Sequence, residues 1–228
     1  MPRAYCGQPP HGYIPWPPGV ATPGVRSFWG SIVNRTVFLV DGFNVYHSLR
    51  ESERVVGRPL DQLDVVGLCR SSLHTIPGQA QAVGVLYFSA LAHHREAEPP
   101  GAIAHQVAYF SALEASGASV HLGQFKARTL RCPLCGRKYV RWEEKETDVA
   151  IGTRLLELLA RDRCDTAVLV TGDTDLVPAV RAERHLHPDR RLGVIQPYRR
   201  VNRELSQSAD FALTIRAAKY ARHQLSTL

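Results

Sequence analysis

The chain has 228 residues, which is enough for one domain with a sizeable core and some decoration. Its composition, 44% hydrophobic and 21% charged, is ordinary for a soluble globular protein. No apolar run approaches the length of a membrane span, which excludes a membrane-spanning protein. A net charge of +7 favours a polyanionic partner.

The two ends of the chain differ in composition from its middle. Residues 1–34 are rich in Pro and Gly without periodicity, so we expect a flexible leader there. We expect the folded domain at residues 35–216 and a basic tail at residues 217–228. The N-terminus has no signal pattern, and the five cysteines form no disulfide framework. We therefore expect a protein of the reducing cytoplasm, with no membrane partner.

From residue 36 onward, short apolar runs alternate with helical patterns. Strands are predicted at residues 36–41, 82–88, 119–125, 167–171 and 192–195, with an added edge strand at 211–215. Helices are predicted at residues 44–53, 60–74, 103–116, 147–161, 177–185 and 202–207. This alternation predicts an α/β fold, with right-handed crossovers and helices on both faces of a mainly parallel sheet.

Carboxylates stand where two buried strands end. Asp41 ends the first strand, Asp173 and Asp175 follow the fourth, and Asp148 lies where a long helix starts. Ligands bind at the carboxyl edge of open α/β sheets, and clustered carboxylates need a cation or raised pKa values. The alternative is that these residues only cap helices and form turns, as Asp often does. The joint pattern at several such positions favours a metal site.

Three blocks of sequence resemble the signature blocks of the NYN domain family, the PIN-like nucleases that include the LabA-like proteins. The blocks are Phe38-Leu-Val-Asp-Gly-Phe-Asn44, Lys145-Glu-Thr-Asp-Val-Ala-Ile151 and Val170-Thr-Gly-Asp-Thr-Asp-Leu-Val-Pro178. They occur in the family's order, and the resemblance covers about residues 36–215. It implies a metal-dependent ribonuclease with a PIN-like, Rossmann-like fold. It also implies the strand order 3-2-1-4-5, which makes the first and fourth strands neighbours.

The resemblance matches Asp41, Asp148, Asp173 and Asp175 to the acidic site of the family, and Asn44 to its polar companion. Such oxygen ligands suit Mg²⁺ or Mn²⁺. We expect Asp41 and Asp173 to be the main ligands, with the other two acids acting directly or through water. The resulting hypothesis is an endoribonuclease that hydrolyses RNA phosphodiester bonds. The alternative is a non-catalytic RNA-binding or regulatory module, and the complete acid set favours the enzyme.

Four further polar residues accompany the acids. Asn44 and Thr171 are expected to orient a phosphate or a water molecule. Lys145 either holds a phosphate or balances the charge of the acids beside it. Asp210 is a weaker candidate, since a strand-edge or capping role explains it as well.

A basic, cysteine-bearing insert is expected at residues 126–145, which hold seven Lys or Arg and two Glu. Arg137, Lys138 and Arg141 are expected to contact RNA phosphates, and a solvated surface is the alternative. Cys132-Pro-Leu-Cys-Gly136 resembles a zinc knuckle and supplies two of the four ligands that structural Zn²⁺ needs. The other two would be histidines, for example His121, His93 or His94, or would come from a second copy in a homodimer. The alternative is two free thiols at a hairpin.

Overall fold

The computed structural model describes residues 33–95 and 100–225, so residues 1–32 of the expected leader lie outside the described residues, while its last two residues, 33 and 34, begin β1. It contains a seven-stranded sheet in the order β4-β3-β2-β1-β5-β6-β7. The strands are β1 (Val33–Asp41), β2 (Gln79–Ala90), β3 (Ser119–Arg131), β4 (Lys138–Lys145), β5 (Thr166–Val170), β6 (Arg191–Gln196) and β7 (Phe211–Thr214). All neighbours pair in parallel except β3 and β4. The prediction of a mainly parallel α/β sheet is confirmed.

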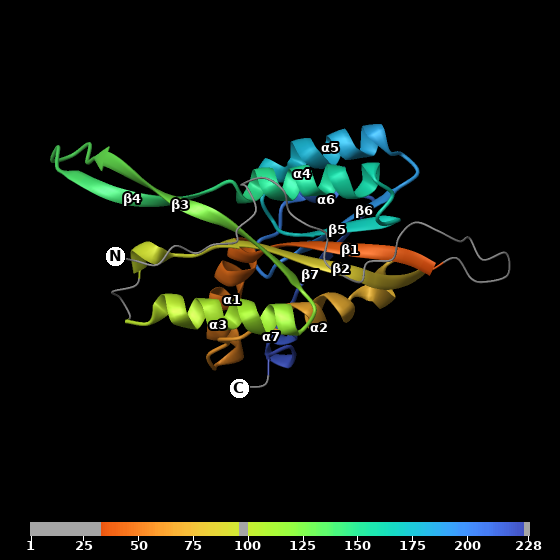
Figure 1. Cartoon of the computed structure of the whole chain (residues 1–228), viewed down its shortest axis with the longest axis horizontal. Helices are drawn as coiled ribbons and strands as arrows, with labels where there is room; N and C mark the ends of the chain where they lie inside the picture. Colours follow the sequence, from red (N-terminus) through yellow and green to blue (C-terminus); the bar gives the residue numbers. More distant parts are fainter. Residues whose placement is uncertain (1–32, 96–99, 226–228) are drawn as a thin grey trace, which may run out of the picture.

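Helices cover both faces of this sheet (Figure 1). One face carries α1 (Gly42–Val56), α2 (Val65–Arg70), α3 (Ala102–Ala115) and α7 (Ala217–Arg222), and the other carries α4 (Thr147–Ala160), α5 (Val177–Leu186) and α6 (Arg203–Ser208). Three short 3₁₀ helices are η1 (Leu73–Thr75), η2 (His93–Arg95) and η3 (Thr174–Leu176). None of the helices in the described part of the chain is long and apolar enough to cross a membrane.

The strand order reverses between β1 and β5. From β1 the chain winds outward through β2 and β3, and from β5 it winds the other way through β6 and β7. All of β5 and residues 36–41 of β1 are buried, because their apolar side chains pack into a core on each face. Their carboxyl ends therefore meet at the topological switch point, where ligands bind in folds of this type. The expected neighbourhood of the first and fourth strands is confirmed.

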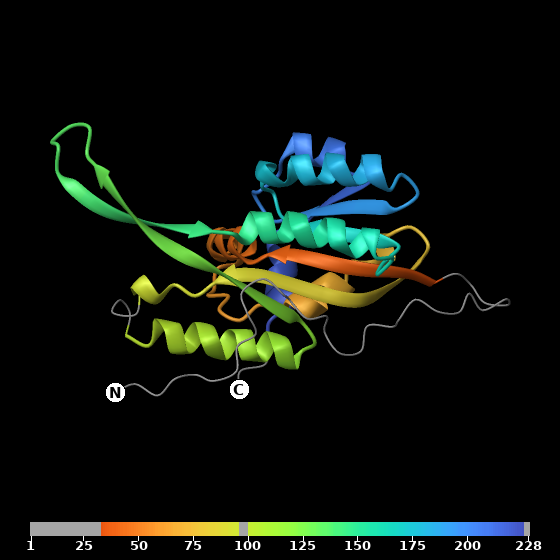
Figure 2. The same cartoon turned by 45° about the horizontal axis from the view of Figure 1, so that its top comes forward.

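Residues 126–145 form the largest departure from a simple doubly wound sheet. The predicted strand 119–125 continues to Arg131 and pairs with β4 in an antiparallel hairpin, with residues 132–137 as its turn. We call residues 124–145 the arm, and Figure 2 shows it extending away from the helices and the rest of the sheet. Strands are recognised in a sequence by apolar residues that alternate with polar ones and face a core. Most residues of the arm are exposed and face no core, so periodicity does not predict the arm as strands.

Two helical segments also differ from expectation. The predicted helix 60–74 begins only at Val65, because the Asp64 side chain accepts a hydrogen bond from the Gly67 amide and caps the helix there. The expected tail after residue 216 contains α7, which packs against α1. Tyr220 in α7 is fully buried, and its hydroxyl lies 2.8 Å from Ser48 Oγ.

Candidate metal centre

Asp41 occupies the last position of β1 and is only 4% exposed. One carboxylate oxygen accepts the Asn44 amide at 3.0 Å, which caps α1, and the other accepts the Thr171 hydroxyl at 2.8 Å. Burial raises the pKa of Asp41, while the hydrogen bond from the Asn44 amide opposes that rise. The capping role weighed in the sequence is therefore real, and it fixes the carboxylate at the switch point.

The turn after β5 is tied to Asp41 through two side chains. Thr171 Oγ1 donates to Asp41 and accepts the Asp173 amide at 3.0 Å. Asn44 Oδ1 accepts the Gly172 amide at 3.1 Å. Only glycine fits at position 172, because a Cβ there would lie 1.9 Å from the Arg200 carbonyl oxygen. Asn44 and Thr171 thus connect the two strand ends, so the two turns hold one fixed geometry.

Three of the predicted acids come together at this edge. Asp148 enters from the first turn of α4, and ligand atoms of Asp41, Asp148 and Asp173 all lie within 4.8 Å of one another. Burial and the charges of Asp41, Asp173 and Asp175 raise the pKa of Asp148 to about 6. The carboxylates therefore repel one another, and a cation among them would relieve this repulsion.

Asp175 lies at the rim of the group. Its side chain is exposed, and its amide donates to Asp173 Oδ1 at 3.0 Å, so that Asp173 caps η3. Its carboxylate is not within the 4.8 Å group, although its charge acts on Asp148. Asp210 lies elsewhere: its Oδ2 accepts the Leu192 amide at 2.8 Å, in the structural role weighed for it.

Glu144 is a fourth acid at this edge. It was not predicted as a site residue, because the sequence shows it only as one of two Glu in the basic insert. Burial, followed by the charges of Asp41, Asp148 and Asp173, raises its pKa to about 8. Its Oε1 is buried and has no hydrogen-bond partner among the described residues. The cluster therefore offers oxygen ligands that the protein itself leaves unsatisfied, which fits a hard divalent cation. The spacing of Glu144 and Asp148 gave no signal, because one lies on β4 and the other on α4.

The basic residues are distributed over both faces of the arm. Lys145 Nζ lies 3.1 Å from Glu143 Oε2, and strand alternation turns both away from the face that holds Glu144. Arg141 shares the face of Glu143, whereas Lys138 is on the face of Glu144 and Arg137 is in the turn. Their contact with phosphate remains a prediction.

The cysteine pair lies at the tip of the arm. The Leu134 and Cys135 amides hydrogen-bond to the Cys132 sulfur, with that of Cys135 as the larger effect, and lower its pKa. Amides aimed at one sulfur in this way favour the thiolate that binds metal. No third metal-binding side chain joins this pair in the part of the chain that the structure describes.

The expected histidine ligands have other neighbours. His121 is buried and stacks on Phe88 with ring centroids 4.9 Å apart. His94 stacks on Trp142 at 4.8 Å, near the base of the arm. These histidines are therefore engaged at the body of the protein rather than grouped with the cysteines at the tip.

The structure defines an α/β protein with an open, doubly wound sheet and an acid cluster at its switch point, and the close aspartates fit a divalent-cation site. The family model for the NYN domain matches residues 35–216. This chain belongs to the NYN domain family, whose PIN-like fold is generally that of nucleases acting on RNA.

Two known proteins show how far the similarity extends. The chain is 27% identical over 199 residues to 6-hydroxy-3-succinoylpyridine 3-monooxygenase HspA of Pseudomonas putida, covering 74% of this chain and 61% of that protein. It therefore spans less than two thirds of that relative. A crystal structure of a protein of unknown function from Vibrio parahaemolyticus matches with a TM-score of 0.53 and 19% identity. That match covers 82% of this chain and 97% of the other, and it supports the fold.

Proposed function

We propose that the protein is a metal-dependent endoribonuclease that hydrolyses RNA phosphodiester bonds with Mg²⁺ or Mn²⁺. The observation that carries the proposal is the group of Asp41, Asp148 and Asp173, whose ligand atoms lie within 4.8 Å of one another at the switch point of an NYN domain. A divalent cation held there would supply an activated water and stabilise the charge of the leaving oxygen. Glu144 extends the ligand set, and Asp175 acts from the rim.

The surrounding side chains keep these carboxylates in place. Asp41 accepts hydrogen bonds from the Asn44 amide and the Thr171 hydroxyl, so its two oxygens cannot rotate freely. Thr171 also accepts the Asp173 amide, which couples the two principal ligands. Such pre-organisation lowers the cost of assembling the site around a cation and a phosphate. Asn44 and Thr171 thus act by positioning the ligands, and by orienting water or phosphate beside them.

The test is cleavage by the purified full chain of labelled RNA and DNA, with Mg²⁺, Mn²⁺ or a chelator. We expect RNA to be cut internally with either metal and to remain intact with the chelator. Absence of metal-dependent cleavage, combined with salt-sensitive RNA binding, would favour the non-catalytic RNA-binding module. Preferential cleavage of DNA would overturn the assignment of RNA as substrate.

We propose that the arm contributes RNA contacts outside the acid cluster. Arg137, Lys138 and Arg141 are exposed, and Trp142 is 44% exposed on the arm face that also holds Glu144. Basic side chains interspersed with aromatic rings suit a flexible single strand, because phosphates and bases alternate along it. Lys145 contributes to the same field but is paired with Glu143.

We propose further that Cys132 and Cys135 bind Zn²⁺ together with the same pair of a second copy, which joins two arms in a homodimer. The lowered pKa of Cys132 and the exposure of the tip support this arrangement. Zinc content and molar mass test it: we expect one ion per two chains, and monomers after Cys132→Ser. One ion per monomeric chain would place the remaining ligands within the same chain.

The four described cysteines are free thiols, which supports a reducing, cytoplasmic location.

A second candidate function follows from the name of the relative that acts on a hydroxypyridine. The observation that favours it is an aromatic-lined cavity of about 540 Å³ beside the acid cluster. Under this reading the chain would oxidise a small heterocycle with O₂ and an external electron donor. Consumption of 6-hydroxypyridine-type compounds with both reagents present would support it, and the absence of consumption would leave the nuclease.

A further inference from the structure

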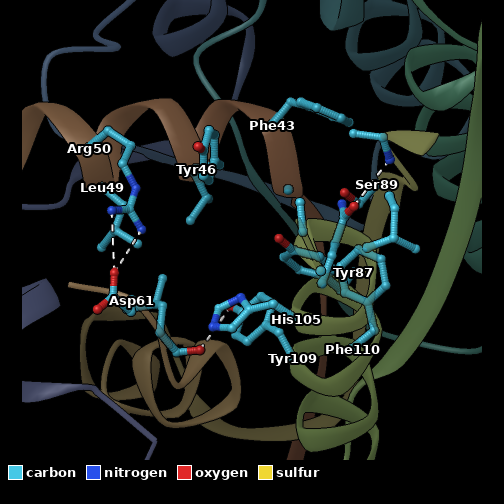
Figure 3. A pocket seen from close by; sticks show the side chains of 18 of the residues that line it. Phe43, Tyr46, Leu49, Arg50, Asp61, Tyr87, Ser89, His105, Tyr109 and Phe110 are labelled. Carbon is cyan, nitrogen blue, oxygen red and sulfur yellow. Dashed lines mark hydrogen bonds and ion pairs between the residues drawn. The ribbon is translucent and has the colours of Figure 1, made fainter. Parts of the chain in front are cut away.

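A cavity lies between α1 and α3, next to the candidate metal centre (Figure 3). Its volume of about 540 Å³ is within the range of roughly 300–1,000 Å³ usual for small-ligand pockets. Its walls are rich in rings, namely Phe43, Tyr46, Tyr87, His105, Tyr109 and Phe110. In Figure 3, Phe43 and Tyr46 come from α1, and His105, Tyr109 and Phe110 lie across the cavity from them. This lining favours a flat aromatic ligand.

The cavity and the acid cluster share a wall. Gly42 and Phe43 line the cavity and directly follow Asp41. A Cβ at position 42 would lie 2.7 Å from the Tyr87 hydroxyl, so Tyr87 packs directly under the turn that positions Asp41. Burial raises the pKa of Tyr87, and the charge of Asp41 raises it further. The turn that positions Asp41 is therefore also part of the cavity wall.

The far end of the cavity is polar. Arg50 carries its guanidinium 5.5 Å from the centre of the Tyr46 ring and 3.5 Å from the Asp61 carboxylate. Most of the Asp61 side chain is exposed, so it can accept hydrogen bonds from a ligand edge. Rings along the walls and a charged pair at one end match a ligand with two aromatic faces and a polar edge, which is the chemistry of a nucleobase.

We propose that this cavity binds one nucleobase of the RNA strand, that of a nucleotide next to the phosphate held at the acid cluster. The proposal rests on the proposed nuclease function and adds a base-binding subsite to it. Tyr46 is 42% exposed at the cavity wall and supplies a stacking face, whereas Tyr87 and Phe110 are buried and shape the floor. A base held there sets the register of the strand, so cleavage occurs at a fixed distance from a preferred base.

The test measures binding without cleavage, on the full chain carrying Asp173→Asn in the presence of Mn²⁺. A short labelled RNA is titrated with a single abasic residue placed at each position in turn. Tyr46→Ala removes the exposed ring, and Tyr46→Phe keeps it. Val55→Ala is the matched control, because Val55 lies on the same helix, is 62% exposed and does not line the cavity.

We expect one position at which the abasic residue weakens binding about tenfold, as for the loss of one base–aromatic stack. Tyr46→Ala should weaken the binding of intact RNA by a similar factor, and the abasic residue at that position should then cause no further loss of affinity. Tyr46→Phe and Val55→Ala should retain the loss of affinity caused by the abasic residue. If Tyr46→Ala leaves the loss of affinity caused by the abasic residue unchanged at every position, the proposal is wrong. Tight binding of free 6-hydroxy-3-succinoylpyridine that depends on Tyr46 and is not competed by RNA would also overturn it and assign the cavity to a small heterocycle.

Cleavage by the wild type is measured in parallel, which separates the two ideas. Loss of metal-dependent cleavage with the Tyr46-dependent base effect intact would refute the nuclease and leave the base site standing. Cleavage at full rate with no Tyr46-dependent effect would refute the base site and leave the nuclease.

Discussion

Two groups of carboxylates lie at opposite ends of β1 and β5, and their surroundings differ in sign. At the carboxyl ends, Asp41, Asp148 and Asp173 are close together with raised pKa values at the first two. At the amino ends, Asp162 and Asp165 surround Arg35 at 2.8 and 2.9 Å. Aspartates thus form two clusters, one at each end of the same pair of strands.

The amino-end cluster is balanced by the protein itself. Arg190 adds ion pairs of 2.7 Å to Asp162 and 3.1 Å to Asp165. A hydrogen bond from Arg35 lowers the pKa of Asp162. Burial alone would raise the pKa of Asp165, but hydrogen bonds from Arg35 outweigh burial and lower it. Two guanidinium groups therefore neutralise two carboxylates, and the cluster fastens β1 to the loop before β5.

The difference separates a cluster whose charge the protein balances from a cluster that fits a cation site. A folded protein keeps carboxylates together only when their charge is compensated or their protons are retained. Arginine compensates one end, and among the residues that the structure describes no cation lowers the pKa of Asp148 or Glu144 at the other. The uncompensated negative charge at the carboxyl end fits a divalent cation bound among the carboxylates. The following predictions test the contrast, starting with the largest effect.

The largest effect is expected for Asp173→Asn at the carboxyl end. Asn caps helices about as well as Asp, so the variant should fold and melt slightly higher without metal, because repulsion is relieved. RNA cleavage should fall at least about 100-fold, since each ~1.4 kcal/mol of lost transition-state stabilisation is worth tenfold. Single-turnover cleavage and melting with and without Mn²⁺ measure both effects. Asp189→Asn, an exposed control, should change neither; a wild-type rate for Asp173→Asn would remove that residue from the mechanism.

Arg35→Met should act in the opposite way, on stability and not on chemistry. It leaves two partly buried carboxylates facing only Arg190, so the free energy of unfolding should fall by about 2 kcal/mol. Urea unfolding at pH 7 measures the loss, with exposed Arg70→Met as the control. Metal-dependent cleavage by the folded variant should remain near the wild-type rate. A stability loss no larger than that of Arg70→Met would show that the pairs contribute little.

The pH dependence of that loss has a definite sign. The folded pKa values of Asp162 and Asp165 are lowered, so their stabilisation is complete above the unfolded pKa, about 4, and disappears as the pH falls through the folded values. The difference between wild type and Arg35→Met should therefore be full at pH 7 and shrink in acid. A difference that stays constant as the pH is lowered below about 4 would contradict the electrostatic account.

Glu144→Gln tests whether the unforeseen acid belongs to the metal centre. The variant keeps the size of the side chain and removes its charge, so Mn²⁺ affinity should fall about tenfold while the fold persists. Glu143→Gln is a close control, because it lies next to Glu144 on β4 and faces the other way. Titration with Mn²⁺ by calorimetry distinguishes the two. Equal losses for both variants would indicate a general charge effect rather than a ligand.

The smallest effect is expected for the arm. Arg141→Gln should weaken RNA binding severalfold and reduce the slope of log affinity against log salt by about 0.7, the value for one single-strand phosphate contact. Arg137→Gln and Lys138→Gln should behave alike, whereas Arg70→Gln, in α2 at a distance from the arm, should not (Figure 1). Unchanged affinity over low and moderate salt would return these residues to the role of a solvated surface.

The sequence by itself determined the acidic edge of the sheet. A buried apolar run has a direction, and in a parallel sheet all the residues that follow such runs arrive at one edge. Asp41 and Asp173 could therefore be assigned to this edge before any contact was known, whereas their placement on neighbouring strands, with Asp148 beside them, rested on what the resemblance to the NYN domain family implies. Local hydrogen bonding also made the capping roles of Asp41 and Asp173 predictable, because Asp accepts hydrogen bonds from the amides that follow it.

Only the tertiary structure decided what surrounds that edge. Glu144 faces the acids because the arm pairs Glu144 with Phe125, and a shift of one residue would turn it outward with Glu143. The aromatic cavity joins Tyr46 on α1 to His105 on α3, which periodicity within either helix does not relate. The partners of Arg35 are about 130 residues away. Such contacts depend on register and packing between distant segments, and local sequence patterns predict neither of them.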